Sequence, residues 1–145
     1  MKRRFAIAGD YRTLAEMNHQ LIKDEGHRNP MSIGQLEERM RSWLMSEGYQ
    51  AILFEDRSEI VAYALFRETD EEVHLRQLFV VRHRRREGIG RLVMQDLFAF
   101  WPQQKRWTVS VLVKNASGVA FWRAMGYTDY ELTLEIIPET VHKTS

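Results

Sequence analysis

The stretch Arg85-Arg86-Glu87-Gly88-Ile89-Gly90 decides the fold of this chain. It joins an apolar, strand-like run, residues 75–81, to a run with helical periodicity, residues 88–100. Two glycines in the first turn of a helix leave backbone N–H groups uncovered, and the helix dipole adds partial positive charge there. More basic side chains crowd the same corner, namely Arg82, His83 and Arg84. We therefore expect a strand-to-helix corner that binds phosphate groups.

Two familiar phosphate-binding loops do not fit this spacing. A dinucleotide-binding fingerprint needs a third glycine or alanine three residues after Gly90, where this chain has Val93. A P-loop needs Gly-Lys-Ser/Thr, which the chain lacks. The remaining pattern, Arg/Gln-x-x-Gly-x-Gly/Ala after a strand, resembles the coenzyme A loop of the GNAT superfamily of N-acetyltransferases, where it binds the pyrophosphate of acetyl-CoA. The alternative interpretation is a basic, solvated turn whose glycines only start a helix.

Length and composition are those of a soluble globular protein. The chain has 145 residues, of which 44% are hydrophobic and 28% are charged, so residues 1–145 are expected to form a single domain. No apolar run approaches the ~18 residues that span a bilayer, and Gly9-Asp10 interrupts the apolar core that a signal peptide needs. These features predict a cytoplasmic protein with no membrane partner.

Cysteine usage and net charge exclude several kinds of chemistry. The chain has no cysteine, which excludes a disulfide, a thiolate nucleophile and a cysteine-based metal site. His19 and His142 have no neighbours at metal-ligand spacing, and we predict no metal. The net charge is only +1. The arginine cluster is therefore a local feature, which favours a discrete anionic ligand over nucleic acid.

The hydrophobic pattern predicts an α/β (α+β) fold in the order β-α-α-β-β-β-α-β-α-β. The expected strands are residues 3–8, 49–55, 59–67, 73–81, 107–113 and 127–137. The expected helices run from Asp10 to Gly26, from Ser32 to near Gly48, and over residues 88–101 and 116–125. Short turns between the central strands imply antiparallel hairpins. A single mixed, mostly antiparallel sheet with helices on both faces is the simplest packing.

Local signals mark the ends of the first two helices. Asp10 is a candidate N-cap for the first helix, and Gly26 is a candidate stop. Ser32 with Gln35 is a capping-box signature at the start of the second helix.

A second stretch strengthens the resemblance to the GNAT superfamily. Residues 115–127, NASGVAFWRAMGY, look like the other signature of the family: an asparagine after the fifth strand, a short helix with an aromatic pair, and then Gly-Phe/Tyr. Both motifs fall on the expected elements in the order of the family. The resemblance covers residues 3–137 and implies a GNAT-like sheet whose fourth and fifth strands splay apart.

The resemblance also implies an acetyl-CoA site at the corner. Backbone N–H groups and the Arg85 side chain would hold the pyrophosphate, with Arg82, Arg84 and Arg91 as candidates for the ribose phosphate. Main-chain groups of the fourth strand would hold the pantetheine arm like an added strand, and one N–H there would stabilise the oxyanion. Asn115 would bind the arm from the other side, unless it serves only as a helix cap. The candidate cofactor-binding residues are Leu78, Phe79, Val80, Arg85, Arg86, Glu87, Gly88, Ile89, Gly90, Arg91, Asn115 and Trp122.

Catalysis requires a group that takes a proton from an amine whose pKa is about 10. His74 is the first candidate, because it lies eleven residues before Arg85, at a strand position where some family members carry a catalytic glutamate. Strand alternation predicts that its side chain shares one face with Arg76, Leu78 and Val80. Glu72 is the second candidate. A half-exposed strand histidine without a catalytic role is the alternative.

The leaving thiolate raises a separate question. Family members often place a tyrosine second in the aromatic pair, as general acid, where this chain has Trp122. An indole N–H donates a hydrogen bond but is no useful acid near neutrality. Tyr127 or Tyr130 is a candidate substitute, and a position in the core is the alternative for both. Without a cysteine, direct attack of the amine on the thioester is preferred over a ping-pong path.

The expected partner is a primary amine on a small molecule or a peptide. Asp24 and Glu25 are candidate contacts for its positive charge, although they also suit a solvated helix end. Trp43 and Tyr63 are candidates to line an aromatic pocket, with a core role as the default. An exposed last strand is a candidate contact between the subunits of a homodimer. Two other functions stay open: a non-catalytic acetyl-CoA sensor, and a nucleic-acid or peptide adaptor that uses the arginine cluster.

Overall fold

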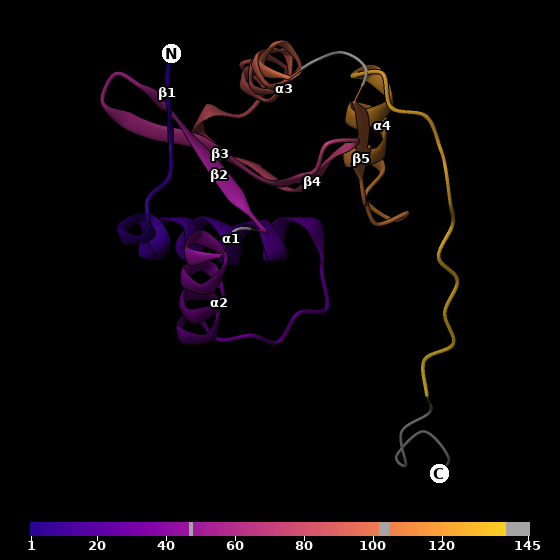
Figure 1. Ribbon diagram of the computed structural model, residues 1–145. Coiled ribbons are helices and arrows are strands. Elements are labelled where there is room, and N and C mark those ends of the chain that lie inside the picture. Colours follow the sequence, from indigo (N-terminus) through magenta and orange to yellow (C-terminus); the bar gives the residue numbers. More distant parts are fainter. Residues whose placement is uncertain (47, 102–104, 139–145) are drawn as a thin grey trace.

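The computed structural model describes residues 1–46, 48–101 and 105–138. One sheet runs through these residues in the order β1-β2-β3-β4-β5, and its neighbours are antiparallel except for the parallel pair β4–β5. The strands are β1 (Lys2–Phe5), β2 (Gln50–Asp56), β3 (Glu59–Glu68), β4 (Glu72–Val80) and β5 (Arg106–Val109). Helices α1 (Tyr11–Glu25) and α2 (Ile33–Met45) cover one face, and α3 (Ile89–Phe100) and α4 (Ala116–Ala124) lie on the other side (Figure 1). The predicted class of fold is confirmed.

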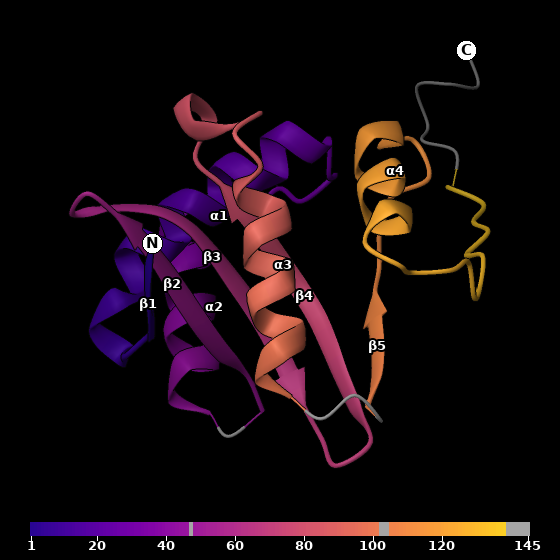
Figure 2. The same cartoon turned by 90° about the horizontal axis from the view of Figure 1, so that it is seen from above.

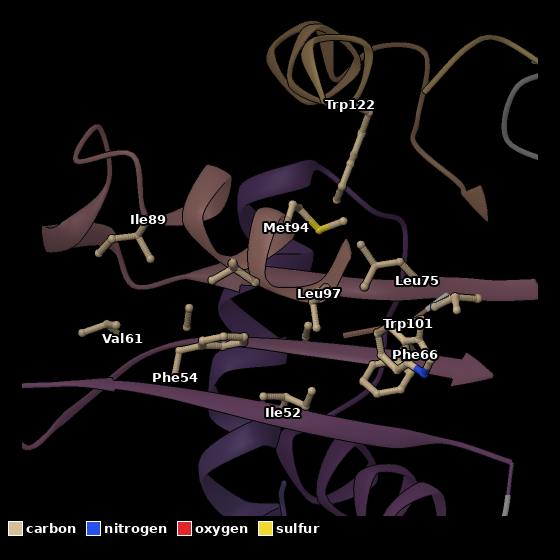
Figure 3. Close-up of a cluster of buried hydrophobic side chains, with 14 residues drawn as sticks. Ile52, Phe54, Val61, Phe66, Leu75, Ile89, Met94, Leu97, Trp101 and Trp122 are labelled. Carbon is tan, nitrogen blue, oxygen red and sulfur yellow. The ribbon is translucent and has the colours of Figure 1, made fainter. Parts of the chain in front are cut away.

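Two apolar cores hold the layers together, one on each face of the sheet. Phe66 and Leu97 are fully buried between the sheet and α3, and Trp122 of α4 reaches the same core (Figure 3). Leu14 of α1 and Met40 of α2 are fully buried against the opposite face. Burying each such side chain contributes about 1.5–3 kcal/mol. Because β3 and β4 contribute to both cores, they form the rigid centre on which the site is built.

The predicted helix ends are confirmed at two places and wrong at a third. Gly26 ends α1 in the left-handed conformation, with a φ of 70°. The side chains of Ser32 and Gln35 form the capping box that starts α2. Asp10, however, makes no side-chain cap on α1. Its carboxylate instead accepts a hydrogen bond from the backbone N–H of Ile7 at 2.8 Å, which closes the short 3-10 turn η1 (Ala8–Asp10).

The pairing between strands β4 and β5 ends halfway along β4. Their ladder pairs residues 72–75 with residues 106–109 and ends at Leu75–Val109. Beyond that pair, β4 continues to Val80, whereas β5 ends at Val109 (Figure 2). The edge of β4 that faces β5 is therefore free from residue 76 onward. We call the space along this free edge the slot; it corresponds to the splay of the fourth and fifth strands that the resemblance to the GNAT superfamily implied.

Three of the expected strands differ from the structure. The first, expected over residues 3–8, ends at Phe5. β5 ends at Val109 instead of residue 113, because the chain turns where the backbone N–H of Asn115 donates to the Leu112 carbonyl at 2.9 Å. The predicted last strand, residues 127–137, is not formed; the segment runs as an extended trace beyond α4 (Figure 1). Among the described helices, none combines the length and apolar character needed to cross a bilayer.

Candidate functional site

The corner between β4 and α3 presents an uninterrupted row of free backbone donors. After the 3-10 turn η2 (Arg82–Arg84), Arg86 and Gly88 take left-handed conformations with φ values of 68° and 78°. From Arg86 to Arg91, no backbone N–H donates to any other residue that the structure describes; the first such bond runs from Leu92 to the Gly88 carbonyl, at 3.1 Å. These N–H groups lie at the N-terminus of α3, where the helix dipole favours an anion.

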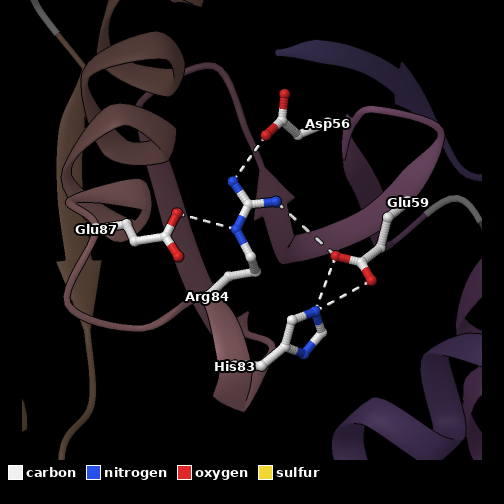
Figure 4. Close-up of polar contacts among 5 residues, drawn as sticks. All are labelled: Asp56, Glu59, His83, Arg84 and Glu87. Carbon is white, nitrogen blue, oxygen red and sulfur yellow. Dashed lines mark hydrogen bonds and ion pairs between the residues drawn. The ribbon is translucent and has the colours of Figure 1, made fainter.

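Arg84 holds this corner in place. Its guanidinium lies 2.7 Å from Asp56, 2.9 Å from Glu87 and 3.8 Å from Glu59 (Figure 4). The Nε2 atom of His83 lies 3.0 Å from the same Glu59 carboxylate. These contacts tie the corner to the β2–β3 hairpin. Arg84 is therefore held by carboxylates of the protein, although it also lines the cavity beside the corner; its contact with a ribose phosphate stays a prediction.

A cavity of about 470 Å³ opens beside the corner and gathers most of the predicted cofactor-binding residues. Those that line it are Leu78, Phe79, Val80, Arg85, Arg86, Gly88, Ile89, Gly90, Arg91 and Asn115. Two predicted members do not line it: Glu87, whose carboxylate pairs with Arg84, and Trp122. The wall also contains residues that the sequence did not single out for it, namely Leu21, Asp24, Glu25, Ser117, Gly118 and Phe121.

The aromatic pair of α4 divides between this cavity and the core. Trp122 is 9% exposed and packs into the core beneath α3, whereas Phe121 lines the cavity. Successive helical residues point about 100° apart, so only one of the pair can face the cavity. A Cβ atom on Gly90 would lie 3.4 Å from the Phe121 ring. The second glycine of the corner therefore lies against the Phe121 ring of α4, a neighbour that the sequence motif alone did not reveal.

Asp24 of α1 faces the same cavity and binds two arginines of the corner. Its two carboxylate oxygens each lie 2.6 Å from a guanidinium, one of Arg82 and one of Arg85. Burial raises the pKa of Asp24, but the hydrogen bonds from the two arginines lower this pKa overall. Arg85 also donates from Nε to the Val80 carbonyl at 2.8 Å, which fixes its side chain at the end of β4. Asp24 therefore offers no free carboxylate to an amine.

Asn115 both caps α4 and lines the cavity. Its Oδ1 accepts a hydrogen bond from the backbone N–H of Gly118 at 3.1 Å. Its Nδ2 donates to none of the residues that the structure describes, so it can donate to a ligand. Across the slot, Leu78, Phe79 and Val80 supply the opposite wall, in the part of β4 that β5 does not pair with.

A second cavity of about 470 Å³ lies at the other end of β4 and contains both candidate bases. It is lined by Arg67, Thr69, Glu71, Glu72, His74 and Arg106. The slot that starts at the corner ends at the Leu75–Val109 pair, directly beside His74. A ligand arm laid along the slot from the corner therefore ends near His74.

Thr108 of β5 bridges the two candidate bases. Its Oγ1 lies 2.8 Å from Nδ1 of His74 and 3.1 Å from Oε1 of Glu72. A carboxylate only accepts hydrogen bonds, so the single hydroxyl proton points to Glu72 and Thr108 accepts from Nδ1–H of His74. In neutral His74, Nε2 is then the unprotonated nitrogen that a base requires. Burial and the charges of Arg67 and Arg76 lower the pKa of His74, although Glu72 opposes them, which favours the neutral ring at pH 7.

A β-bulge separates the two cavities. Opposite the middle of β3, the register slips by one residue and leaves Arg76 without a partner on β3. Leu75 and Leu78 consequently both pack toward the core beneath α3. The prediction that His74 shares a face with Leu78 is therefore wrong, because an extra residue reverses the alternation of side chains beyond it.

The other aromatic candidates lie away from both cavities. Tyr127 packs against Trp122 with ring centroids 5.4 Å apart, and burial raises the pKa of its phenol. Its hydroxyl is buried without a partner among the described residues. A buried phenol with a raised pKa is a weaker acid, so the structure gives no support to Tyr127 as the acid for a thiolate. Tyr63 is fully buried and donates to Gln77 at 2.8 Å, and Trp43 stacks against arginines of the α2 face.

The described residues also contain no group of three histidine, cysteine, aspartate or glutamate side chains that could hold a metal ion. His142 lies outside the described residues.

Comparison with protein families agrees with this geometry. The family described as acetyltransferase (GNAT) domain matches residues 15–135, a range that includes the lining residues of both cavities. The chain therefore belongs to the GNAT family of acetyltransferase domains. A search of curated proteins found no match.

Solved structures share this fold at low sequence identity. A mutant BH1408 protein from Bacillus halodurans has a TM-score of 0.79 and 22% identity, over 96% of this chain and 100% of that one. The aminoglycoside N-acetyltransferase AAC(6')-Iy in complex with CoA has a TM-score of 0.74 and 10% identity, over 96% and 95%. A ribosomal-protein-alanine N-acetyltransferase from Brucella melitensis biovar Abortus 2308 has a TM-score of 0.72 and 11% identity, over 95% and 99%. At such identities the likeness establishes the fold alone.

Proposed function

We propose that this protein is an N-acetyltransferase that moves the acetyl group of acetyl-CoA to a primary amine, on a small molecule or a peptide, by direct attack. The observation that carries the proposal is the row of unpaired N–H groups, Arg86 to Arg91, at the mouth of a slot along β4. Such a corner suits a diphosphate, and an unpaired strand edge suits an arm that contains amides. The family match supports this donor, as does the CoA bound by a neighbour of the same fold.

Acetyl-CoA, the donor, would lie along β4, with its diphosphate at the corner and its thioester near the second cavity. Its diphosphate accepts hydrogen bonds from the corner N–H groups and from Arg85. Its pantetheine arm lies in the slot between the free edge of β4 and Asn115, whose Nδ2 is available to donate. Phe121 supplies an apolar wall. The thioester then reaches the end of the slot, beside His74.

The reaction requires one proton acceptor and one site for negative charge. The amine nitrogen attacks the thioester carbonyl carbon, so that a C–N bond forms, the C–S bond breaks and CoA leaves as its thiolate. Nε2 of His74 takes the proton of the amine, directly or through a water molecule. A main-chain N–H on the free edge of β4 stabilises the charge on the carbonyl oxygen. A thiol with a pKa near ~8.5 leaves readily as thiolate, so no tyrosine acid is required.

The acceptor would enter through the cavity that contains His74. Glu71 and Glu72 bring negative charge to this cavity, and Arg67 and Arg106 bring positive charge. The carboxylates attract an ammonium group, and the lowered pKa of His74 keeps its ring ready to deprotonate it. The mixed charge of the lining favours a polar amine over an apolar one.

Two measurements test this function in sequence. The first is thermal melting with and without CoA: ligand at 100 times its dissociation constant should stabilise the fold by ~2.7 kcal/mol, which raises Tm by several degrees. The second is release of free thiol from acetyl-CoA across a panel of primary amines. Because the chain has no cysteine, every thiol detected comes from the donor. An unchanged Tm at millimolar CoA would contradict the donor site.

An acetyl-CoA sensor without turnover is the second candidate. Its support is that no tyrosine is found among the residues lining the corner cavity; Tyr127 instead packs against the core. A sensor would show the shift in Tm but no thiol release with any amine. The adaptor for nucleic acid has weaker support, because the net charge of the chain is only +1 and Arg82 and Arg84 are paired with carboxylates of the protein.

A further inference from the structure

A group of three arginines extends from His74 along the face of the sheet that α1 and α2 cover (Figure 1). Arg67 of β3 is the partner of His74 in the β3–β4 ladder, and Arg76 follows two residues further along β4. Burial lowers the pKa of His74, and the charges of Arg67 and Arg76 lower it as well. Burial and the charge of Arg76 also lower the pKa of Arg39, on α2. The three guanidinium groups therefore form one positive region that begins beside the candidate base.

Two aromatic rings hold these guanidinium groups. The guanidinium carbons of Arg39 and Arg76 lie 4.5 and 4.8 Å from the centre of the Trp43 ring. That of Arg67 lies 5.7 Å from the centre of the Tyr49 ring, which packs against Trp43 with centroids 5.2 Å apart. Stacking on a ring restricts the side chain but leaves the N–H groups at the rim of the guanidinium free to donate.

The three arginines form no ion pair with any carboxylate that the structure describes. Arg39 donates to the neutral side chain of Asn18 at 2.9 Å, and its Nε is buried without a described partner. At the corner, by contrast, Arg82 and Arg85 share the carboxylate of Asp24. Positive groups that lie close together repel one another, and a bound anion relieves that repulsion.

The β-bulge of β4 brings Arg76 into this region. Consecutive residues of a regular strand point to opposite faces, but a bulge changes the direction of the side chains around it. Here Arg76 contacts Trp43, while its neighbour Gln77 accepts a hydrogen bond at 2.8 Å from Tyr63, which lies in the core beneath α1 and α2. Both residues therefore serve the same face, and the bulge adds a positive charge to it.

The second cavity carries charges of both signs next to this region. Glu72 pairs with Arg106 at 2.9 Å. Glu71 and Arg67 also line the cavity, and neither forms an ion pair with a described residue. A molecule with an ammonium group and an anionic group a few bonds apart matches this arrangement, because each of its charges finds the opposite charge.

We propose that Arg67 and Arg76 form an anion site, and that the acceptor is a primary amine that also carries a carboxylate or a phosphate. This inference rests on the proposed function, because the anion site orients the acceptor relative to His74. The anionic group accepts hydrogen bonds from the two guanidinium groups, and Arg39 adds a third positive charge. Same-face residues of a strand lie about 7 Å apart, so a short chain between the two groups places the amine at His74.

Matched pairs of acceptors test the anion site. Propylamine and β-alanine have the same chain length, but only β-alanine carries a carboxylate; butylamine with γ-aminobutyrate and ethanolamine with phosphoethanolamine are further pairs. In at least one pair, kcat/KM measured by thiol release should be about tenfold higher for the anionic member. The pair with the largest ratio shows whether a carboxylate or a phosphate is preferred. A ratio of one or less in every pair overturns the anion site.

Removing Arg76 should reduce this preference. The side chain is exposed, so Arg76→Gln should fold, and the ratio of kcat/KM between anionic and neutral acceptor should fall by about tenfold. A change that acts only through the pKa of His74 alters both acceptors alike and leaves the ratio unchanged. Arg12→Gln is the matched control, because Arg12 is also exposed and lies 5.6 Å from the centre of the Tyr11 ring. Its ratio should equal that of the parent; an unchanged ratio in Arg76→Gln overturns the assignment.

Calorimetric titration with β-alanine, γ-aminobutyrate and phosphoethanolamine separates this proposal from the proposed function, because it requires no turnover. At least one of these compounds should bind the unmodified protein, and Arg76→Gln should bind it about tenfold more weakly. If no amine releases thiol but this difference is found, the anion site stands and acetyl transfer fails. If neutral amines release thiol while no anionic compound binds or is preferred, acetyl transfer stands and the anion site is wrong.

Discussion

Nδ1 of His74 and Oγ1 of Thr108 lie 2.8 Å apart across the parallel pair β4–β5, just where the slot along β4 ends. Because Thr108 also donates to Glu72, the contact selects one tautomer of His74 and leaves Nε2 as its basic nitrogen. The position of the candidate base and the location of its lone pair therefore depend on the same hydroxyl.

Replacing Thr108 tests this arrangement. Thr108→Val keeps the shape of the side chain but removes the hydroxyl, so His74 loses its orientation and kcat should fall by about tenfold. Thr108→Ser restores the hydroxyl and should recover most of the rate. The KM for acetyl-CoA should change little in either variant. Equal rates for the valine and serine variants would show that the hydroxyl does not position His74.

The pH dependence of kcat/KM should show the titration of His74. Its pKa is lowered from the usual 6.5, mainly by burial, so the acidic limb of kcat/KM should fall below pH 6.5. Below that limb the ring is protonated and cannot accept a proton, and the rate falls as the pH falls. Glu72→Gln removes a charge that raises this pKa and should move the limb to still lower pH. His74→Gln should remove the limb and lower kcat by about 100-fold; a limb that persists in this variant excludes His74 as the base.

Gly88 should matter for CoA more than for folding. Its φ of 78° costs an alanine about 1–2 kcal/mol, and a Cβ there meets no atom within 4 Å, so Gly88→Ala should fold with a lower Tm. The methyl group would project toward the N–H row and should weaken CoA binding by about tenfold. Gly9→Ala is the matched control, because its Cβ also has open space without the unusual φ. Calorimetric titration with CoA compares the two; equal affinities would place the diphosphate elsewhere.

Asp24 should compete with the diphosphate for the arginines of the corner. Asp24→Asn removes one negative charge next to Arg82 and Arg85, so CoA affinity should rise by several-fold at low salt. The gain should shrink at high salt because the effect is electrostatic. The ion pairs of Asp24 also stabilise the fold, because they lower the pKa of Asp24 in the folded state. This stabilisation is present above the pKa that Asp24 has in the unfolded chain, and it is lost as the pH falls through its pKa in the folded protein. Weaker CoA binding in the asparagine variant would mean that Asp24 mainly orients Arg85.

The variant Tyr127→Phe tests whether Tyr127 only packs against the core or also donates a proton to the leaving thiolate. The phenol hydroxyl is buried without a described partner, so its removal should leave the free energy of unfolding unchanged or raise it by up to about 1 kcal/mol. The rate of acetyl transfer should stay within about twofold of the parent, because the leaving thiolate needs no acid. Denaturant unfolding and thiol release measure the two effects. A rate loss of about 100-fold at unchanged stability would assign the proton to Tyr127.

The sequence predicted the corner well because its chemistry is local. The two glycines, the arginines and the start of α3 lie within a few residues of one another, so spacing alone predicted a strand-to-helix corner with free backbone N–H groups; that this corner binds phosphate stays a prediction. The same holds for the Ser32–Gln35 capping box. In both cases, the groups that interact are neighbours in the chain.

Predictions from the sequence were wrong or incomplete where the structure depends on packing between segments that are distant in the chain. The bulge at Arg76 reflects how β4 fits β3, and no local signal marked it. The choice of Phe121 over Trp122 for the cavity follows from how α4 lies against α3. Asp24 suited an amine by charge, but its partners, Arg82 and Arg85, are about 60 residues away along the chain. Residues 127–137 have the alternating pattern of a strand, yet in the structure they form no main-chain ladder with β5.

The ion pairs of Arg84 have a kinetic consequence. They fix the β4–α3 turn before any acyl carrier arrives, so an incoming molecule meets a receptor that is already shaped. Capture should then depend on diffusion and orientation and not on the ordering of a loop. Carriers with different acyl groups should accordingly associate at similar rates and differ in how long they stay bound.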